Sequence, residues 1–207
     1  MTGFLQAGRP PLILASTSKT RARMLEKAGL AFIAEAPGLD EGLMLQAIGD
    51  EKTLHPHDAA EVLARAKAEA VSDLAKSAFV IGADQVLVFE GRIISKPENM
   101  KAARAQLLDL SGRTHTLHTS VALANNGGTV WAQTDIANLT MRKLTPEFIG
   151  HYLAAAGEVV LSSVGAYQFE SIGSQLFEKI DGDFFSILGL PLLPLLDTLR
   201  REGVIES

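Results

Sequence analysis

The chain has 207 residues, a formal net charge of −5, 47% hydrophobic and 21% charged residues, and no cysteine. This length suits one domain with a substantial core, or one domain with two lobes, and the composition is that of an ordinary soluble globular protein. The acidic balance argues against a general nucleic-acid binder, and the lack of cysteine excludes disulfides and thiolate zinc sites. We expect a cytoplasmic protein without a membrane partner, because no apolar run reaches the ~18 residues that span a bilayer and residues 1–10 lack a signal-peptide core.

Hydrophobic periodicity predicts strands and helices that interleave along the whole chain. From the N-terminus, the pattern predicts a strand at 12–15, a helix from the N-cap Ser18 to Gly29, a strand at 31–36, a helix at 57–76 and a strand at 78–82. It then predicts a hairpin of 86–89 with 92–95, a helix at 100–110, strands at 116–124 and 129–141, a helix around 148–153 and a last helix from Pro191. In the helix at 57–76, the stripe expected to face the core contains Leu63, Ala66, Ala70 and Leu74. Interleaved strands and helices that include hairpins indicate the α/β class with a mixed sheet.

The first predicted strand runs directly into a cluster of hydroxyls and cations. Three hydroxyl residues follow the strand without a glycine or proline, and four cations fall within the nine residues 19–27. A strand that leads into a helix N-terminus leaves backbone N–H groups unpaired, and the helix dipole favours an anion there. Cations are unfavourable at that end of a helix, so a bound anion would account for them. The alternative is a serine-capped helix with solvated cations.

The stretch VIGADQVLVFEGRIISKP, residues 80–97, places a carboxylate inside an apolar strand region. Burying Asp84 is costly unless the carboxylate is paired, hydrated or bound to metal. A hairpin that turns at Glu90-Gly91 is expected to bring Asp84 roughly opposite Lys96. Such a pair is either a structural salt bridge or part of a functional site.

Two further loops carry acidic residues. Asp40 and Glu41 stand together after the second predicted strand, where a solvated turn is the alternative to a site. Glu170 follows a glycine, small residues and an aromatic in VGAYQFES, where the alternative is a Gly-Ala turn packed by Tyr167. The histidines expected to be structural or at the surface, rather than metal ligands, are His55, His57, His115 and His118.

Six stretches occur together in the order found in one family, and in them the chain resembles the Maf (septum formation protein) family. They are LILASTSKTRARMLEKAGL, GLDE, VIGADQVLVFEGRIISKP, LSGRTHTLHTSVAL, VGAYQFES and IDGDFFSILGLPLLPLL. The resemblance covers the chain from residue 12 to about residue 199. It implies an ITPase-like (Maf-like) α/β fold, with a mixed sheet, flanking helices and two lobes around a deep cleft. It also implies a single domain over residues 1–207, with its two lobes in about 10–200.

The resemblance further implies an activity. Members of the family hydrolyse nucleoside triphosphates to the monophosphate and pyrophosphate with a divalent metal cation, so the chain is expected to be a nucleoside triphosphate diphosphatase that uses Mg²⁺ or Mn²⁺. The implied partner is a small nucleotide rather than a nucleic acid or a membrane, and a homodimer is compatible with the resemblance.

The family's motifs imply roles for residues of this chain. The implied substrate-binding residues are Ser16, Arg21, Lys67, Gln85 and Glu170. The implied catalytic residues are Asp84, as proton acceptor, and Lys96. The implied metal ligands are Asp84 with Glu41 or Asp40.

Three departures from the family pattern bear on the substrate. Where Ser-Pro-Arg-Arg is usual, residues 18–21 read Ser-Lys-Thr-Arg, so one arginine is missing, and Lys19 and Arg23 are the candidates to supply its charge. Gln85 and Glu170 replace the usual threonine and glutamine, as in the subgroup that acts on 7-methyl-GTP. We therefore expect guanine-type, and especially methylated, substrates.

Two alternatives remain open from the sequence. One is a nucleotide-sensing regulator of cell division without turnover, which the missing arginine favours and the retained Asp84 and Lys96 oppose. The other is a pyrophosphatase that prefers dTTP or UTP.

Overall fold

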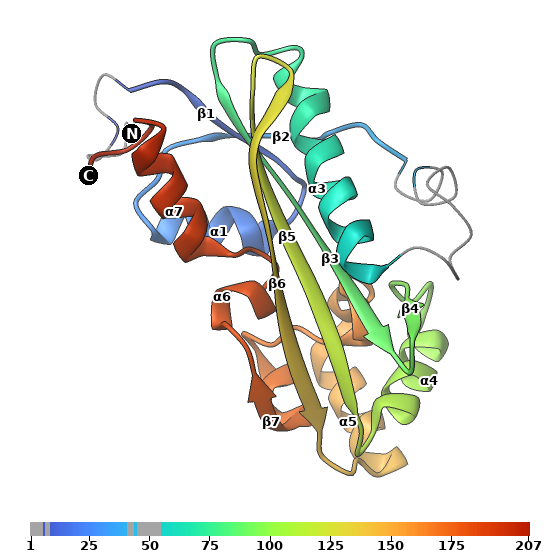
Figure 1. Ribbon diagram of the computed structural model, residues 1–207. Coiled ribbons are helices and arrows are strands. Elements are labelled where there is room, and N and C mark those ends of the chain that lie inside the picture. Colours follow the sequence, from blue (N-terminus) through green and yellow to red (C-terminus); the bar gives the residue numbers. More distant parts are fainter. Residues whose placement is uncertain (1–5, 7–8, 41–43, 45–54) are drawn as a thin grey trace.

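The computed structural model describes residue 6, residues 9–40, residue 44 and residues 55–207 (Figure 1). Its strands are β1 (Leu12–Ala15), β2 (Ile33–Glu35), β3 (Phe79–Phe89), β4 (Arg92–Ile94), β5 (Thr114–Asn125), β6 (Gly128–Met141) and β7 (Phe177–Asp181). Its α-helices are α1 (Lys19–Lys27), α3 (Pro56–Ser72), α4 (Met100–Leu110), α5 (Pro146–Ala156), α6 (Phe184–Ile187) and α7 (Leu192–Arg201). Short 3₁₀ helices are η2 (Gly157–Ser162), η3 (Val164–Ala166) and η4 (Ile172–Leu176).

The described strands form one mixed sheet. Its order is β2-β1-β3-β5-β6-β7, and β4 pairs with β3 beside this path. Strand β1 is parallel to both neighbours, whereas the pairs from β3 to β7 are antiparallel. The turn between β5 and β6 lies at Asn126-Gly127, where both residues have a positive φ, as the sequence predicted. The α/β class with a mixed sheet and flanking helices is confirmed.

Two long strands, β5 and β6, run the length of the molecule, β3 runs beside β5, and a hydrophobic core lies at each end (Figure 1). One core joins α1 and α7 to the sheet, with Leu25 and Leu199 fully buried. The other joins α4 and α5 to the sheet, around Leu87 and Ile149. Two cores agree with the expected two lobes, whereas the deep cleft and the single domain over the whole chain stay predictions.

Helix α3 differs from its prediction in length and in its buried face. It ends at Ser72, so Leu74 lies beyond it and is 87% exposed. Ala64 and Ala68 are fully buried, whereas Ala66 and Ala70 are only partly buried. An alanine-rich helix offers no single apolar stripe from sequence, and close packing against β3 selects the face instead.

Strand β3 is continuous where the sequence predicted a short strand followed by a separate hairpin. It runs through Asp84 without a break, because the carboxylate of Asp84 is paired with Lys67 of α3 and need not face solvent. Strand β7 was not predicted, since four of its five residues are exposed and give no clear alternation.

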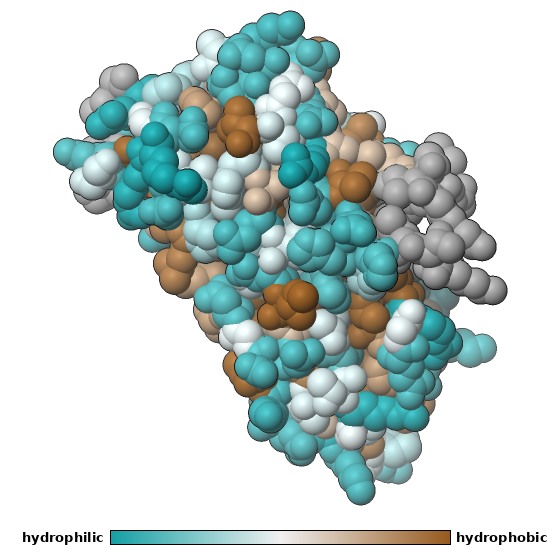
Figure 2. All heavy atoms as spheres, viewed as in Figure 1, coloured by the Kyte–Doolittle hydropathy of each residue, from teal (hydrophilic) through white to brown (hydrophobic). Residues whose placement is uncertain are grey.

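The surface is mixed in character. Figure 2 shows one face on which apolar side chains form small separate patches among hydrophilic ones. Across the described ranges, none of the helices is both long enough and apolar enough to cross a membrane.

Candidate active site

The junction of β1 and α1 gathers hydroxyls and a guanidinium at a helix N-terminus. Ser18 caps α1 as predicted, because its Oγ accepts a hydrogen bond from the backbone N–H of Arg21 (3.3 Å). The buried Ser16 accepts from the backbone N–H of Ser18 (3.2 Å) and from Nη1 of Arg21 (3.3 Å). No acidic side chain lies in the first turn of α1. Helix dipole, hydroxyls and guanidinium therefore converge where a phosphate would be stabilised.

A glycine in β3 lets α3 lie close to the sheet. A Cβ atom at Gly82 would stand 2.2 Å from the carbonyl oxygen of Ala64 and 2.6 Å from the backbone nitrogen of Ala68. At this separation Nζ of Lys67 donates to Oδ1 of Asp84 over 2.5 Å. Both residues are buried, with 5% and 7% of their surface exposed. The predicted lysine and the predicted proton acceptor thus form a buried ion pair.

The register of the sheet places the middle of β3, with Asp84, beside the carboxyl end of β1. Strand β1 is parallel to β3, and Ala15 pairs with Gly82. Ser16 follows Ala15, and Asp84 lies two residues beyond Gly82. Open α/β sheets bind ligands at the carboxyl ends of parallel strands. We therefore treat the Ser16–Arg21 junction and the Lys67–Asp84 pair as one candidate active site.

The predicted meeting of Asp84 with Lys96 across a hairpin stays a prediction. Strand β4 ends at Ile94, so its ladder with β3 stops before Lys96, which is exposed in the following loop. Asp84 forms a buried ion pair with Lys67 of α3, which the sequence did not predict. A catalytic role for Lys96 stays a prediction.

The structure describes only one of the two acidic residues in the loop after β2. Asp40 is exposed, and Glu41 lies outside the described residues. Their predicted role as metal ligands beside Asp84 therefore stays a prediction.

Gln85 connects β3 to the end of α6. Its Nε2 donates to Oγ1 of Thr119 (2.8 Å) and to the carbonyl oxygen of Ser186 (3.0 Å). The hydroxyl of Thr119 donates to the same carbonyl (2.9 Å). From the other side, Nε of Arg21 donates to the carbonyl oxygen of Gly189 (2.7 Å). Two predicted substrate-binding residues thus hold the C-terminal end of α6, and their contact with substrate stays a prediction.

Glu170 lies beside the first turn of α1, although 150 positions separate it from its partner. Oγ1 of Thr20 donates to Oε1 of Glu170 over 2.9 Å. Both residues line a groove of about 850 Å³ between α1, α6 and α7. The other lining residues are Arg23, Met24, Lys27, Ala28, Phe169, Ser174, Phe184, Phe185, Leu188, Leu192, Leu193 and Leu196. Glu170 therefore lies between the anion-favouring N-terminus of α1 and a largely apolar groove.

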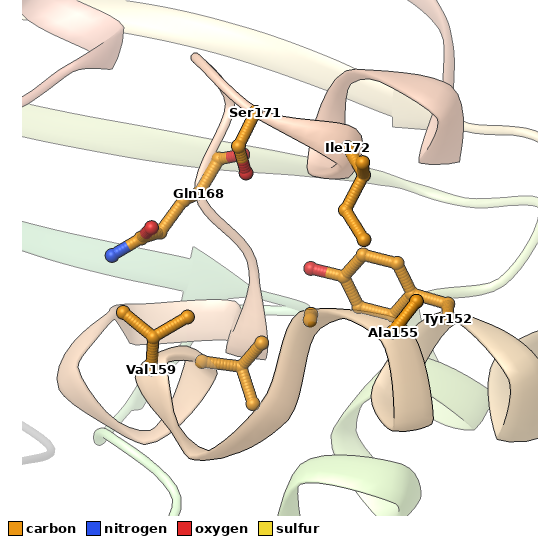
Figure 3. A pocket seen from close by; sticks show the side chains of 8 residues that line it. Tyr152, Ala155, Val159, Gln168, Ser171 and Ile172 are labelled. Atoms are coloured by element: carbon orange, nitrogen blue, oxygen red, sulfur yellow. The ribbon is translucent and has the colours of Figure 1, made fainter.

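A smaller cavity of about 220 Å³ lies in the other half of the molecule (Figure 3). Its lining residues are Tyr152, Ala155, Ala156, Val159, Val160, Gln168, Ser171 and Ile172. The hydroxyl of Tyr152 donates to the carbonyl oxygen of Ala166 (3.2 Å), and burial raises the pKa of this tyrosine to about 12. Because no lining residue is charged, this cavity does not suit a triphosphate.

The donor set can be compared with what a divalent metal requires. Within the described ranges, no three histidine, aspartate or glutamate side chains gather where they could hold a metal ion. Mg²⁺ usually binds one or two carboxylates and completes its shell with water and substrate phosphates. Asp84 offers one buried carboxylate. The residues therefore fit a metal that is shared with the nucleotide better than a metal held by the protein alone.

Sequence reasoning missed the residues that position this site. Three hydrogen bonds that position the site join residues 67 to 168 positions apart in the sequence, and no local pattern identifies such pairs. They are Thr20–Glu170, Arg21–Gly189 and Thr119–Ser186. Gly82 carried the one usable signal, since a glycine inside an apolar strand often marks a close approach of another backbone.

Comparison with known proteins identifies the family of the chain. A model of the family described as Maf-like protein matches residues 11–202. The chain is 49% identical over 196 residues to the 7-methyl-GTP pyrophosphatase of Brucella abortus biovar 1 (strain 9-941), covering 95% of this chain and 98% of that one. It is 51% identical over 195 residues to the 7-methyl-GTP pyrophosphatase of Bartonella quintana (strain Toulouse), covering 94% and 96%. It is 48% identical over 191 residues to the nucleoside triphosphate pyrophosphatase of Paramagnetospirillum magneticum (strain ATCC 700264 / AMB-1), covering 92% and 98%. The chain belongs to the family of Maf-like proteins.

Proposed function

We propose that the chain hydrolyses nucleoside triphosphates to the monophosphate and pyrophosphate, and that its preferred substrates carry a guanine-type base. The observation that carries the activity is the buried Lys67–Asp84 pair in the middle of β3, beside the hydroxyls and guanidinium at the start of α1. Relatives that cover most of the chain are named as pyrophosphatases of this kind, which supports the same activity.

The residues suit attack of water on the α-phosphorus. Asp84 accepts a proton from the water while the oxygen of the water forms a bond to the α-phosphorus. The bond from that phosphorus to the oxygen that bridges it to the β-phosphorus then breaks, which releases pyrophosphate. Ser16 and Arg21 hold phosphate oxygens by hydrogen bonds, which are strong because the acceptors are charged. Lys67 holds the Asp84 carboxylate in place and adds positive charge beside the phosphates.

A divalent cation would be held by Asp84, with Asp40 or Glu41, and by phosphate oxygens, and when bound it would neutralise charge on the triphosphate. The finer identification as Mg²⁺ or Mn²⁺ belongs to this proposal, as do a cytoplasmic location, a homodimeric assembly and a catalytic role for Lys96.

The base preference rests on Glu170. Guanine presents two adjacent donors, the ring N–H and the exocyclic amine, and a carboxylate accepts both. Uracil and thymine present one N–H between two carbonyl oxygens, which suits an amide better than a carboxylate. In the described structure Glu170 is exposed, and its Oε1 accepts from Thr20. Carboxylate oxygens have further lone pairs, so this bond leaves Glu170 able to accept from a base.

Steady-state pyrophosphate release from 7-methyl-GTP, GTP, dTTP, UTP and CTP, with Mg²⁺ or Mn²⁺ present, tests both parts of the proposal. We expect 7-methyl-GTP to have the highest kcat/KM, and Glu170→Gln to shift the preference toward dTTP and UTP. A wild-type enzyme that prefers dTTP and UTP would refute the base assignment only. Nucleotide binding without turnover on any of the five would refute the hydrolase and favour the sensor.

A further inference from the structure

The groove beside Glu170 has the size and lining of a site for a nucleobase. Its volume of about 850 Å³ lies within the ~300–1,000 Å³ typical of small-molecule sites. Glu170 and Thr20 contribute the polar groups near the start of α1, where Ser16 and Arg21 favour phosphate. A nucleotide whose phosphates occupy that helix end would place its base in the adjoining part of the groove.

An exposed aromatic ring stands in this groove. Phe184 lines it and is 49% exposed. The ring of Phe184 contacts Phe169, which precedes Glu170, with centroids 6.3 Å apart and an angle of 68°. It also contacts Phe185 at 5.7 Å and 73°. A half-exposed phenylalanine alone would be ordinary, but this ring is supported by two others and lies in the same groove as the carboxylate.

The helix that carries Phe184 is held firmly to the sheet. Asp183 caps α6 by accepting from the backbone N–H of Ser186 (2.8 Å), and the hydroxyl of Ser186 donates to Asp135 of β6 (2.7 Å). Gln85 donates to the carbonyl oxygen of Ser186 (3.0 Å). These bonds fix the position of the ring before a ligand arrives, and a fixed ring loses little entropy on binding.

We propose that Phe184 is a specificity-determining residue whose ring stacks on the substrate base while Glu170 accepts hydrogen bonds from the base edge, and this inference rests on the proposed function. Methylation at N7 gives the guanine ring a positive charge, and the face of an aromatic ring attracts cations. The stacking therefore favours 7-methylguanine over guanine.

Two cations also line the groove. Arg23 and Lys27 follow Thr20 on α1, and at 1.5 Å per residue they stand about 4.5 Å and about 10 Å further along the helix. Both lie within about a Debye length of Thr20, so they oppose a cationic base, and Arg23 does so more than Lys27. The carboxylate of Glu170, which also lines the groove, attracts a cationic base and offsets this repulsion.

The test compares three substitutions at one position. Phe184→Leu keeps an apolar side chain but removes the aromatic face, Phe184→Ala removes both, and Phe184→Trp keeps a face. Val130→Ala, at a half-exposed apolar residue of β6 that does not line the groove, is the matched control. For each variant, kcat and KM are measured with 7-methyl-GTP, GTP and dTTP, and circular dichroism checks the fold.

We expect Phe184→Leu and Phe184→Ala to raise KM for 7-methyl-GTP about tenfold, in line with the loss of base stacking, with a smaller rise for GTP and little change in kcat. Phe184→Trp should preserve the preference, and Val130→Ala should resemble wild type. Equal effects of Phe184→Leu on the methylated and unmethylated substrates, or none, would overturn the stacking role.

Binding of 7-methylguanosine and guanosine to the same variants, measured by calorimetry, separates this inference from the proposed function. If the wild-type chain releases no pyrophosphate, the hydrolase proposal fails. A preference for 7-methylguanosine that disappears in Phe184→Leu would still support the stacking role, and no such preference would overturn it.

Discussion

Replacing Asp84 by asparagine tests the stability and the catalytic role of the buried ion pair together. Asparagine has nearly the same shape, but it removes the negative charge 2.5 Å from Nζ of Lys67. Loss of one partner of a buried pair typically costs about 3–5 kcal/mol, and with 5% and 7% exposure this pair is little screened by solvent. We expect Asp84→Asn to lose stability in this range and to abolish turnover, because an amide does not accept the proton.

Urea unfolding followed by circular dichroism measures the stability, and pyrophosphate release measures the turnover. The double variant Asp84→Asn with Lys67→Met is the matched control. It removes the buried cation together with its partner, so we expect it to recover much of the lost stability but none of the activity. If Asp84→Asn unfolded at the wild-type urea concentration, the pair would not stabilise the fold. If it also kept wild-type turnover, Asp84 would be neither the base nor an essential ligand.

Three further outcomes are expected. Arg21→Ala should raise KM for triphosphates by at least tenfold, since charge-assisted bonds contribute roughly 1.5–3 kcal/mol each, and an unchanged KM would assign the role to another cation. Gly82→Ala should lower the free energy of unfolding by about 1–3 kcal/mol through overpacking, because its Cβ would meet the Ala64 carbonyl oxygen at 2.2 Å, and wild-type stability would show that α3 can shift freely. Burial lowers the pKa of His115 to about 4, so the unfolded chain, with a histidine pKa near 6.5, binds the proton first. The free energy of unfolding should therefore fall by up to about 3 kcal/mol as pH drops from 6.5 to 4. If the urea midpoint of the wild type fell with pH no more steeply than that of His115→Gln, this reasoning would be contradicted.

Local chemistry made part of the site predictable. An N-cap needs a hydroxyl three residues before a backbone N–H that has no acceptor within the helix. Ser18 provides that hydroxyl, and the structure has the bond. The end of β1 follows from four apolar residues that stop at Ser16. Asp84 attracted notice because a carboxylate within an apolar strand needs a partner, and it has one in Lys67.

The identity of that partner required the fold. Lys96 was the partner expected for Asp84 because, in a hairpin, residues at equal distances from the turn lie opposite each other. Strand β4 is only three residues long, so its pairing with β3 ends before Lys96. Lys67 reaches Asp84 from a helix that packs on the face of the sheet, and its approach depends on the missing side chain at Gly82. Hydrophobic periodicity indicates which face of an element is buried, but it does not indicate which residues of another layer that face will contact.

The contacts of α6 show why the two halves of the site must be considered together. Gln85, next to the proton acceptor, and Arg21, next to the phosphate-binding hydroxyls, both donate to carbonyl oxygens at the end of this helix. The same helix begins with Phe184. Since backbone carbonyls move with their segment, a shift of the backbone of α6 would disturb the hydrogen bonds of residues adjoining the reacting groups. Base recognition and phosphate positioning therefore both depend on residues 184–189, and a substitution that moves the backbone of this segment, unlike one that alters only the Phe184 ring, is expected to change both.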